Sequence, residues 1–143
     1  MKTIIHIDDD LDDLAIFKDV ITRINPSYLL ESFSDSKSAV IFLQNTILKP
    51  SIIFLDINMP ILNGKETLLL IRRNKNLADV PIVMYSTNIY GADKKIYMEL
   101  GANEFLKKAN GLDGMIKDVD QLLLKFIKYD IDEFYNEQKN RGR

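Results

Sequence analysis

Polar side chains that could do chemistry directly follow four short apolar runs in this chain. They comprise carboxylates, hydroxyls and one ammonium: Asp8, Asp9, Asp10, Asp56, Ser86, Thr87 and Lys108. Carboxylates that lie close together repel one another and stay ionised only if a cation is present. A nucleophilic carboxylate, a cation, a hydroxyl and a lysine together are the groups that phosphoryl transfer requires.

Asp56 follows the most apolar of these runs, Ile52 to Leu55. A short continuous run of this kind is typical of a strand that is buried on both faces. A carboxylate at its end costs several kcal/mol unless hydrogen bonds or a cation compensate it. The alternative is that Asp56 only caps the loop that follows, which closes at Pro60 and Gly64.

Strand patterns and helical patterns alternate five times along the chain. This alternation predicts a single α/β domain with a parallel sheet and helices on both of its faces. The carboxyl ends of parallel strands meet at one edge, which is where ligands bind in such sheets. The expected strands are 3–7, 28–33, 52–55, 81–85 and 104–107, and the helices follow from about residues 11, 35, 65, 91 and 112.

The apolar spacing also predicts which face of each helix is buried. The second helix is expected to bury Ile47, and the fourth Ala92, Ile96 and Leu100. Arg72 is expected to point outward, and Lys94, Lys95, Tyr97 and Met98 are expected to be exposed. Asp12 and Asp13 are expected to form a solvated first helical turn, and His6 is interpreted as a packed or satisfied core residue.

Oxygen ligands without His or Cys select a hard cation, and a site with few ligands and open positions suits Mg²⁺ better than Ca²⁺. The acidic cluster after the first strand, the segment Leu-Asp-x-x-Met-Pro-x-x-x-Gly at 55–64, the Ser/Thr pair and Lys108 occur in this order. Together they resemble the receiver domain of response regulators, of the single-domain chemotaxis-regulator type. The resemblance covers residues 3 to about 128 and implies a flavodoxin-like, doubly wound sheet of order 2-1-3-4-5.

The resemblance also implies roles for individual residues. Asp56 would be the phosphoacceptor, supplied by a histidine kinase or phosphotransfer protein. Asp8, Asp9, Asp56 and the backbone carbonyl of Asn58 would hold Mg²⁺, with Asp10 taking one of these roles if the register slips by one. Ser86 and Lys108 would bind the phosphoryl group, with Thr87 the less favoured hydroxyl. The ring of Phe105 would turn inward on phosphorylation, and Asn58 and Asn88 would tune the lifetime of the acyl phosphate.

One position departs from the family, which usually has Pro after the lysine, commonly with a cis bond. This chain has Ala109 there. A cis bond before a non-proline residue costs about 2.5–4 kcal/mol. We therefore predict a trans peptide between Lys108 and Ala109, with a lysine that still reaches the site.

Three other functions compete with phosphoacceptance. A phosphatase of the haloacid-dehalogenase class needs a second acid two residues after its nucleophile, where this chain has Asn58. A flavodoxin needs a phosphate-binding loop rich in Ser, Thr and Gly after the first strand, where this chain has three Asp. The remaining alternative is a receiver-like binding module that is never phosphorylated.

Bulk properties limit the partners. The 143 residues carry a net charge of −2 and no Cys, and no apolar stretch is long enough for a membrane span. We therefore expect no nucleic acid and no membrane contact, a cytoplasmic location, and a signalling protein that catalyses only its own phosphorylation and dephosphorylation. Residues 1–128 would form the receiver domain, which would switch a downstream protein target. Residues 129–143 would form a tail, helical and then disordered, that could pair two copies through the last helix.

Overall fold

A computed structural model describes residues 2–88, 91–127 and 138–142 of the chain. The predicted helical extension of the tail, with its apolar Ile131, Phe134 and Tyr135, lies outside the described residues. The division of the chain near residue 128, and pairing through the tail, therefore stay predictions.

The centre of the molecule is a five-stranded sheet in which all neighbouring strands are parallel. The strand order is β2-β1-β3-β4-β5, which confirms the predicted topology. Consecutive parallel strands need a crossover, and each crossover here contains a helix. The strands are β1 (Thr3–Ile7), β2 (Leu29–Phe33), β3 (Ile52–Leu55), β4 (Ile82–Ser86) and β5 (Glu104–Lys107).

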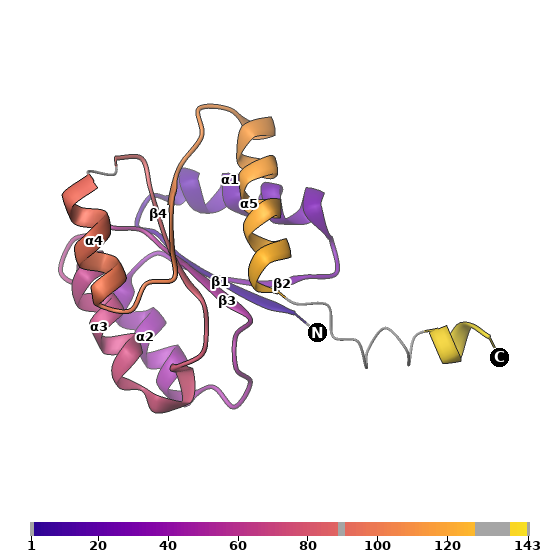
Figure 1. Cartoon of the computed structure of the whole chain (residues 1–143), viewed down its shortest axis with the longest axis horizontal. Helices are drawn as coiled ribbons and strands as arrows, with labels where there is room; N and C mark the ends of the chain where they lie inside the picture. Colours follow the sequence, from indigo (N-terminus) through magenta and orange to yellow (C-terminus); the bar gives the residue numbers. More distant parts are fainter. Residues whose placement is uncertain (1, 89–90, 128–137, 143) are drawn as a thin grey trace.

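Helices cover both faces of this sheet (Figure 1). Helices α1 and α5 pack against each other on one face, and α2, α3 and α4 lie on the other. The helices are α1 (Leu11–Ile24), α2 (Ser36–Asn45), α3 (Gly64–Arg73), the short 3₁₀ helix η1 (Lys75–Leu77), α4 (Gly91–Glu99) and α5 (Leu112–Phe126).

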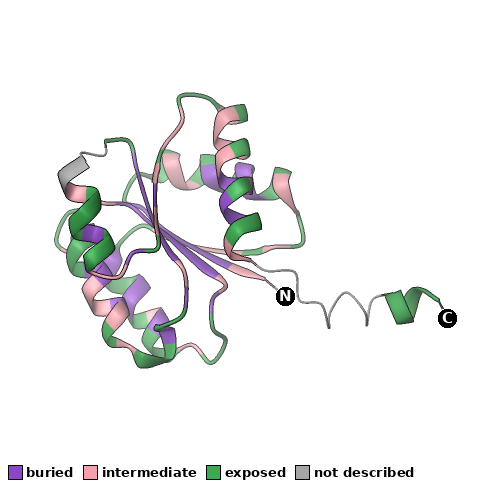
Figure 2. Cartoon of the chain, in the orientation of Figure 1, coloured by how far each residue is buried: buried purple, intermediate pink, exposed green. Residues whose placement is uncertain are grey.

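The three central strands are almost completely buried, as the purple ribbons in Figure 2 show. Successive side chains alternate between the two faces of the sheet and so belong to two separate cores. Ile53 and Leu55 pack under α2, α3 and α4, whereas Phe54 packs under α1 and α5. Each such buried side chain stabilises the fold by roughly 1.5–3 kcal/mol. The strand ends, and the polar residues there, are held by this rigid support.

The structure corrects the predicted buried faces of two helices. Helix α2 ends at Asn45, because Thr46 is extended, and Ile47 is 98% exposed. Helix α4 buries Tyr97, whose ring lies 5.6 Å from the ring of Phe105, while Ile96 is 43% exposed. Tyr97 therefore replaces Ile96 at the centre of the buried face, since its large ring fills the space beside β5, while Leu100 packs against the core as predicted. The predicted burial of Ala92 lies outside the side chains that the structure describes.

Arg72 also differs from the prediction, because it points toward the protein rather than into solvent. Its guanidinium donates to the carbonyls of Gly101 and Leu77, at 2.9 and 2.8 Å, and to the side chain of Asn103. Gly101 has a φ of +113°, which favours glycine, and a Cβ there would lie 3.0 Å from Arg72 Cγ. Arg72 thus ties α3 to the turn that precedes β5.

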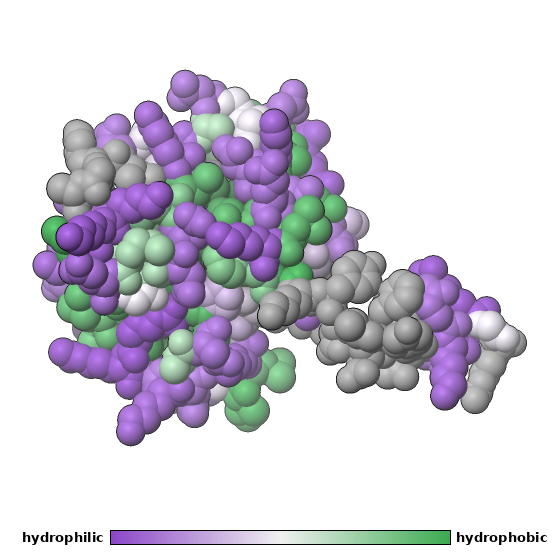
Figure 3. Space-filling view, viewed as in Figure 1, coloured by the Kyte–Doolittle hydropathy of each residue, from purple (hydrophilic) through white to green (hydrophobic). Residues whose placement is uncertain are grey.

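The surface carries polar and apolar residues side by side, and Figure 3 shows them interspersed on the viewed face of the domain. None of the helices in the described part of the chain combines the length and the apolar character needed to cross a bilayer.

Candidate functional site

The three consecutive aspartates after β1 have different environments. Asp8 is buried and Asp9 is exposed at the sheet edge. Asp10 is the N-cap of α1, and its carboxylate accepts from the backbone N–H groups of Asp12 and Asp13 at 2.9 and 3.3 Å. This cap satisfies orphan donors of the first helical turn. The carboxylate of Asp10 therefore caps α1 and does not belong to the acidic cluster.

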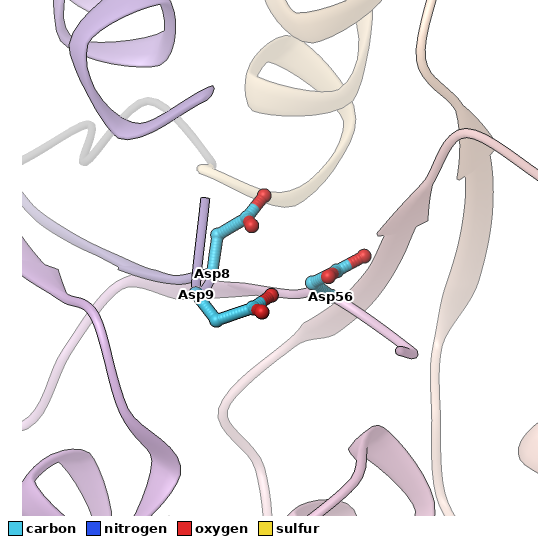
Figure 4. Close-up of side chains that lie close together, drawn as sticks. All are labelled: Asp8, Asp9 and Asp56. Carbon is cyan, nitrogen blue, oxygen red and sulfur yellow. The ribbon is translucent and has the colours of Figure 1, made fainter. Parts of the chain in front are cut away.

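Asp8, Asp9 and Asp56 bring their carboxylates together at the ends of β1 and β3 (Figure 4). One oxygen from each of the three lies within 4.8 Å of the others, a spacing that could hold a metal ion. The backbone N–H of Asp56 donates to the carbonyl of Ile7 at 2.9 Å, which continues the β1–β3 pairing up to the cluster. Parallel pairing thus sets the spacing of these carboxylates.

The loop after Asp56 folds back tightly on the strand end. The backbone N–H of Gly64 donates to the carbonyl of Ile57 at 2.8 Å. A Cβ at Gly64 would lie 2.6 Å from the carbonyl oxygen of Asp56 and 2.7 Å from Ile57 Cα. Only glycine fits this approach. In the same loop Ile61 has a φ of +70°, a strained conformation for a β-branched residue.

Lys108 crosses from the end of β5 to the acidic cluster. Its Nζ donates to Asp8 at 2.7 Å and to Asp13 at 2.8 Å, and lies 4.0 Å from Asp56 Oδ1. The Lys108–Ala109 peptide is trans, as predicted, since no cis peptide occurs in the described residues. The backbone N–H of Lys108 donates to the carbonyl of Ser86 at 2.9 Å, which extends the β4–β5 pairing.

Burial and charge shift the protonation equilibria of these groups. Burial, and then the charge of Asp8, raise the pKa of Asp56 to about 6, while Lys108 opposes the shift. Burial also raises the pKa of Asp8, and the hydrogen bond from Lys108 offsets only part of this. For Lys108, burial lowers the pKa, but the hydrogen bonds to Asp13 and Asp8 outweigh burial and the pKa is raised overall. The pKa values of Asp8 and Asp56 are thus raised although Lys108 is present, so one ammonium does not fully compensate these carboxylates, and a cation would favour their ionised forms.

Asp13 is the residue of this site that the sequence analysis missed. It was expected to be part of a solvated helical turn, but its carboxylate accepts a hydrogen bond from Lys108. Asp13 lies on α1, one helical turn after the Asp10 cap, and is partly buried. The chain has several carboxylates at this helix start, and their spacing did not show which of them faces the β5–α5 loop.

The remaining predicted residues lie on the expected strand ends and loops. Ser86 is buried at the end of β4, while Thr87, Asn88 and Asn58 are exposed. Phe105 is only 9% exposed and already packs against Tyr97, so its ring faces inward in this structure. An inward turn of Phe105 on phosphorylation would need an outward starting position, which this structure does not contain.

Two buried aromatic residues with polar atoms, His6 and Tyr85, lie on β1 and β4. The ring of His6 packs 4.1 Å from Phe17 and is fully buried. Its Nε2 lies 3.7 Å from Asp8 Oδ2, and neither ring nitrogen has a hydrogen-bond partner among the described residues. The hydroxyl of Tyr85 is likewise unpartnered. Burial, and then the charge of Lys108, lower the pKa of His6 to about 3. His6 is therefore a neutral residue of the core, as its interpretation as a packing residue predicted.

Comparison with known proteins agrees with the fold. Residues 4–120 match the family model of the response regulator receiver domain. Response regulator Rcp1 of Synechocystis sp. is 28% identical over 123 residues, which cover 82% of this chain and 84% of Rcp1. Sensory transduction protein BceR of Halalkalibacterium halodurans is 26% identical over 118 residues, and the chain spans about half the length of BceR.

The structural likeness extends over the same part of the chain. The crystal structure of the Mn²⁺-bound form of Rcp1 superposes with a TM-score of 0.78 at 26% identity, and covers 90% of this chain and 97% of that one. The matching family model covers most of the chain, and the structural likeness to Rcp1 extends over the whole parallel sheet. The chain therefore belongs to the response regulator receiver domain family.

Proposed function

We propose that this receiver domain accepts a phosphoryl group on Asp56 from a histidine kinase or a phosphotransfer protein. The observation that carries the proposal is the grouping of the Asp8, Asp9 and Asp56 carboxylates at one sheet edge, with Lys108 Nζ 4.0 Å from Asp56. Asp56 is 7% exposed, so its carboxylate is partly desolvated and still reachable.

The donor set at this edge fits Mg²⁺. Asp9 and Asp56 would ligate it directly, Asp8 through water, and the backbone carbonyl of Asn58 would complete the set. All of these donors are oxygens, which hard cations prefer, and a small octahedral cation keeps several waters. A bound Mg²⁺ supplies positive charge that favours the ionised form of Asp56 and neutralises the phosphoryl oxygens. The structurally similar Rcp1 has been solved in a Mn²⁺-bound form, which supports a divalent cation as a ligand of this chain as well.

The chain's own residues then have distinct tasks. An ionised oxygen of Asp56 attacks phosphorus, the new O–P bond forms as the P–N bond to the donor histidine breaks, and the electron pair of that bond returns to the imidazole. Lys108 donates to a phosphoryl oxygen, and the hydroxyl of Ser86 donates to another. Each phosphorylation is a single event per chain, so the protein is a signalling phosphoacceptor rather than a turnover enzyme.

The signal would leave the domain through a protein contact. Ser86 lies at the end of β4, and the neighbouring β5 carries Phe105 against Tyr97 of α4. A movement of Ser86 toward the phosphoryl group would therefore act on the packing of α4, which exposes Lys94, Lys95 and Met98 to a downstream protein target. Residues 129–143 would provide a tail for pairing with a second copy, which truncation after Tyr129 and sedimentation would test.

The decisive experiment uses the intact chain with Mg²⁺ and acetyl phosphate, followed by intact mass. The wild type should gain one phosphoryl group, and should gain none with a chelator or in Asp56→Asn. Asp12→Asn, which removes an exposed carboxylate nearby, should be phosphorylated like the wild type. A full equivalent on Asp56→Asn would assign the phosphoryl group elsewhere, and no phosphorylation of the wild type by acetyl phosphate or a kinase would favour a binding module.

A further inference from the structure

The ammonium of Lys108 is shared between two carboxylates before any phosphoryl group is present. An ammonium has three N–H donors. Two of them point to Asp8 and Asp13, at 2.7 and 2.8 Å, while Asp56 Oδ1 at 4.0 Å lies beyond hydrogen-bond distance. The positive charge that the proposed function needs at Asp56 is therefore largely engaged by other carboxylates.

The two acceptors differ in how easily they can release the ammonium. The side chain of Asp8 is 1% exposed, so an Asp8 without Lys108 would be a buried, uncompensated charge. The side chain of Asp13 is 31% exposed on α1, so water can replace the lysine there. Hydrogen bonds that water can replace are worth less than buried ones. Asp13 is thus the partner that Lys108 can leave.

We infer that Asp13 is a positioning residue that competes with the phosphoryl group on Asp56 for the ammonium of Lys108. This inference rests on the proposed function, because it concerns the same lysine and the same phosphoacceptor. In the resting chain Asp13 holds one N–H of Lys108. When a phosphoryl oxygen appears, that N–H turns to it and the Asp13 carboxylate is hydrated instead.

The competition predicts that removing the charge of Asp13 strengthens binding of a phosphoryl analogue at Asp56. Replacing Asp13 with Asn keeps the size of the side chain and removes its charge, so Lys108 loses its dispensable partner and is more available to the phosphoryl group. The stand-in for the phosphoryl group is beryllofluoride, which binds a carboxylate as a tetrahedral anion. In saturating Mg²⁺, Asp13→Asn should bind beryllofluoride about 3- to 10-fold more tightly than the wild type, the range expected for one solvent-replaceable charged hydrogen bond.

Asp12→Asn is the matched control. Asp12 lies on the same helical turn, carries the same charge and is exposed, but Lys108 bonds to Asp13 and not to Asp12. Asp12→Asn should change the affinity for beryllofluoride by less than about 2-fold. This change measures the contribution of net charge and the helix dipole alone. Asp13→Glu, which restores the carboxylate, should return the affinity to near the wild-type value.

A double-mutant cycle with Lys108→Ala shows whether the effect passes through the lysine. Adding Asp13→Asn to Lys108→Ala should change the affinity by less than about 2-fold, as Asp12→Asn does in the wild type. The inference is overturned if Asp13→Asn weakens binding, matches Asp12→Asn, or acts equally without Lys108. Failure of the wild type to bind beryllofluoride would overturn the proposed function together with this inference, whereas normal wild-type binding with an unaltered Asp13→Asn overturns this inference alone.

Discussion

Lys108 Nζ lies 2.7 Å from Asp8 and 4.0 Å from Asp56, so the lysine of this site is paired first with the more deeply buried carboxylate. Asp8 has little access to water and depends on this partner for its charge. The metal-free domain therefore contains a buried ion pair at the edge where the proposed chemistry takes place.

Replacement of Lys108 by Met should destabilise the metal-free domain in a pH-dependent way. At pH 8 the loss should be about 2–4 kcal/mol, because Asp8 is left ionised and buried. Burial already raises the pKa of Asp8, and loss of the lysine raises it further, so protonation at lower pH relieves the penalty. Denaturant unfolding with a chelator should show a smaller loss at pH 5 than at pH 8, and equal losses would contradict this account.

Asp56 should lower the stability of the metal-free domain as pH rises. Its pKa in the folded chain is about 6, above the ordinary aspartate value of 3.8, so the folded state holds the proton more tightly than the unfolded chain. The stability that this proton contributes is present below about pH 4 and is lost as pH rises through 6. Asp56→Asn should therefore match the wild type near pH 4 and exceed it by about 2–3 kcal/mol at pH 8. Saturating Mg²⁺ should remove this difference in the free energy of unfolding at pH 8. A difference that stays constant across pH would contradict the prediction.

Substitutions of Asp9 and Asp10 should have different effects, because Asp9 lies in the acidic cluster and Asp10 caps α1. Asp9 belongs to the acidic cluster, so Asp9→Ala should weaken Mg²⁺ binding about tenfold or more while stability without metal stays equal or rises. Asp10 caps α1, so Asp10→Ala should cost about 1 kcal/mol and leave Mg²⁺ affinity nearly unchanged. Calorimetric titration and denaturant unfolding measure the two quantities. The reverse pattern would move the ligand role to Asp10.

Gly64→Ala should disturb the backbone of the phosphoacceptor. The new Cβ would meet the Asp56 carbonyl at 2.6 Å, and a backbone atom can move only with its strand. We expect a loss of about 1–3 kcal/mol from this overpacking, together with slower phosphorylation by acetyl phosphate. Gly111→Ala is the matched control, because a Cβ there meets nothing within 4 Å. Equal effects of the two changes would show that close approach is not the cause.

His6 should make the domain sensitive to acid. Its pKa in the folded chain is about 3, far below the unfolded value of 6.5, so the unfolded chain binds the proton first. Stability from this residue is complete above pH 6.5 and is lost as pH falls toward 3. His6→Phe should reduce this loss. The measurement is the free energy of unfolding between pH 4 and 8, expressed for each protein relative to its own value at pH 8. An unchanged acid slope would assign the loss to other groups.

The pattern of apolar runs was sufficient to predict the fold and most of the site. Continuous apolar strands alternating with 3.6-residue helical patterns allow essentially one layered, parallel arrangement. In that arrangement the residues after β1, β3, β4 and β5 must meet at one edge. The convergence of Asp8, Asp56 and Lys108 was therefore determined by the sequence alone, because strand order and chain direction place them there whatever their rotamers are.

The partners of individual side chains were decided only by the tertiary structure. Asp12 and Asp13 are indistinguishable by residue type, and packing of α1 against α5 determines that Asp13 meets Lys108. Packing likewise determines that α4 buries Tyr97, which contacts Phe105 of β5, and leaves Ile96 exposed. Neighbouring helical residues differ by about 100° around the axis, and an amphipathic pattern locates the buried face only broadly. The rotation of each helix is set by the shapes that it packs against, which lie far away in the chain.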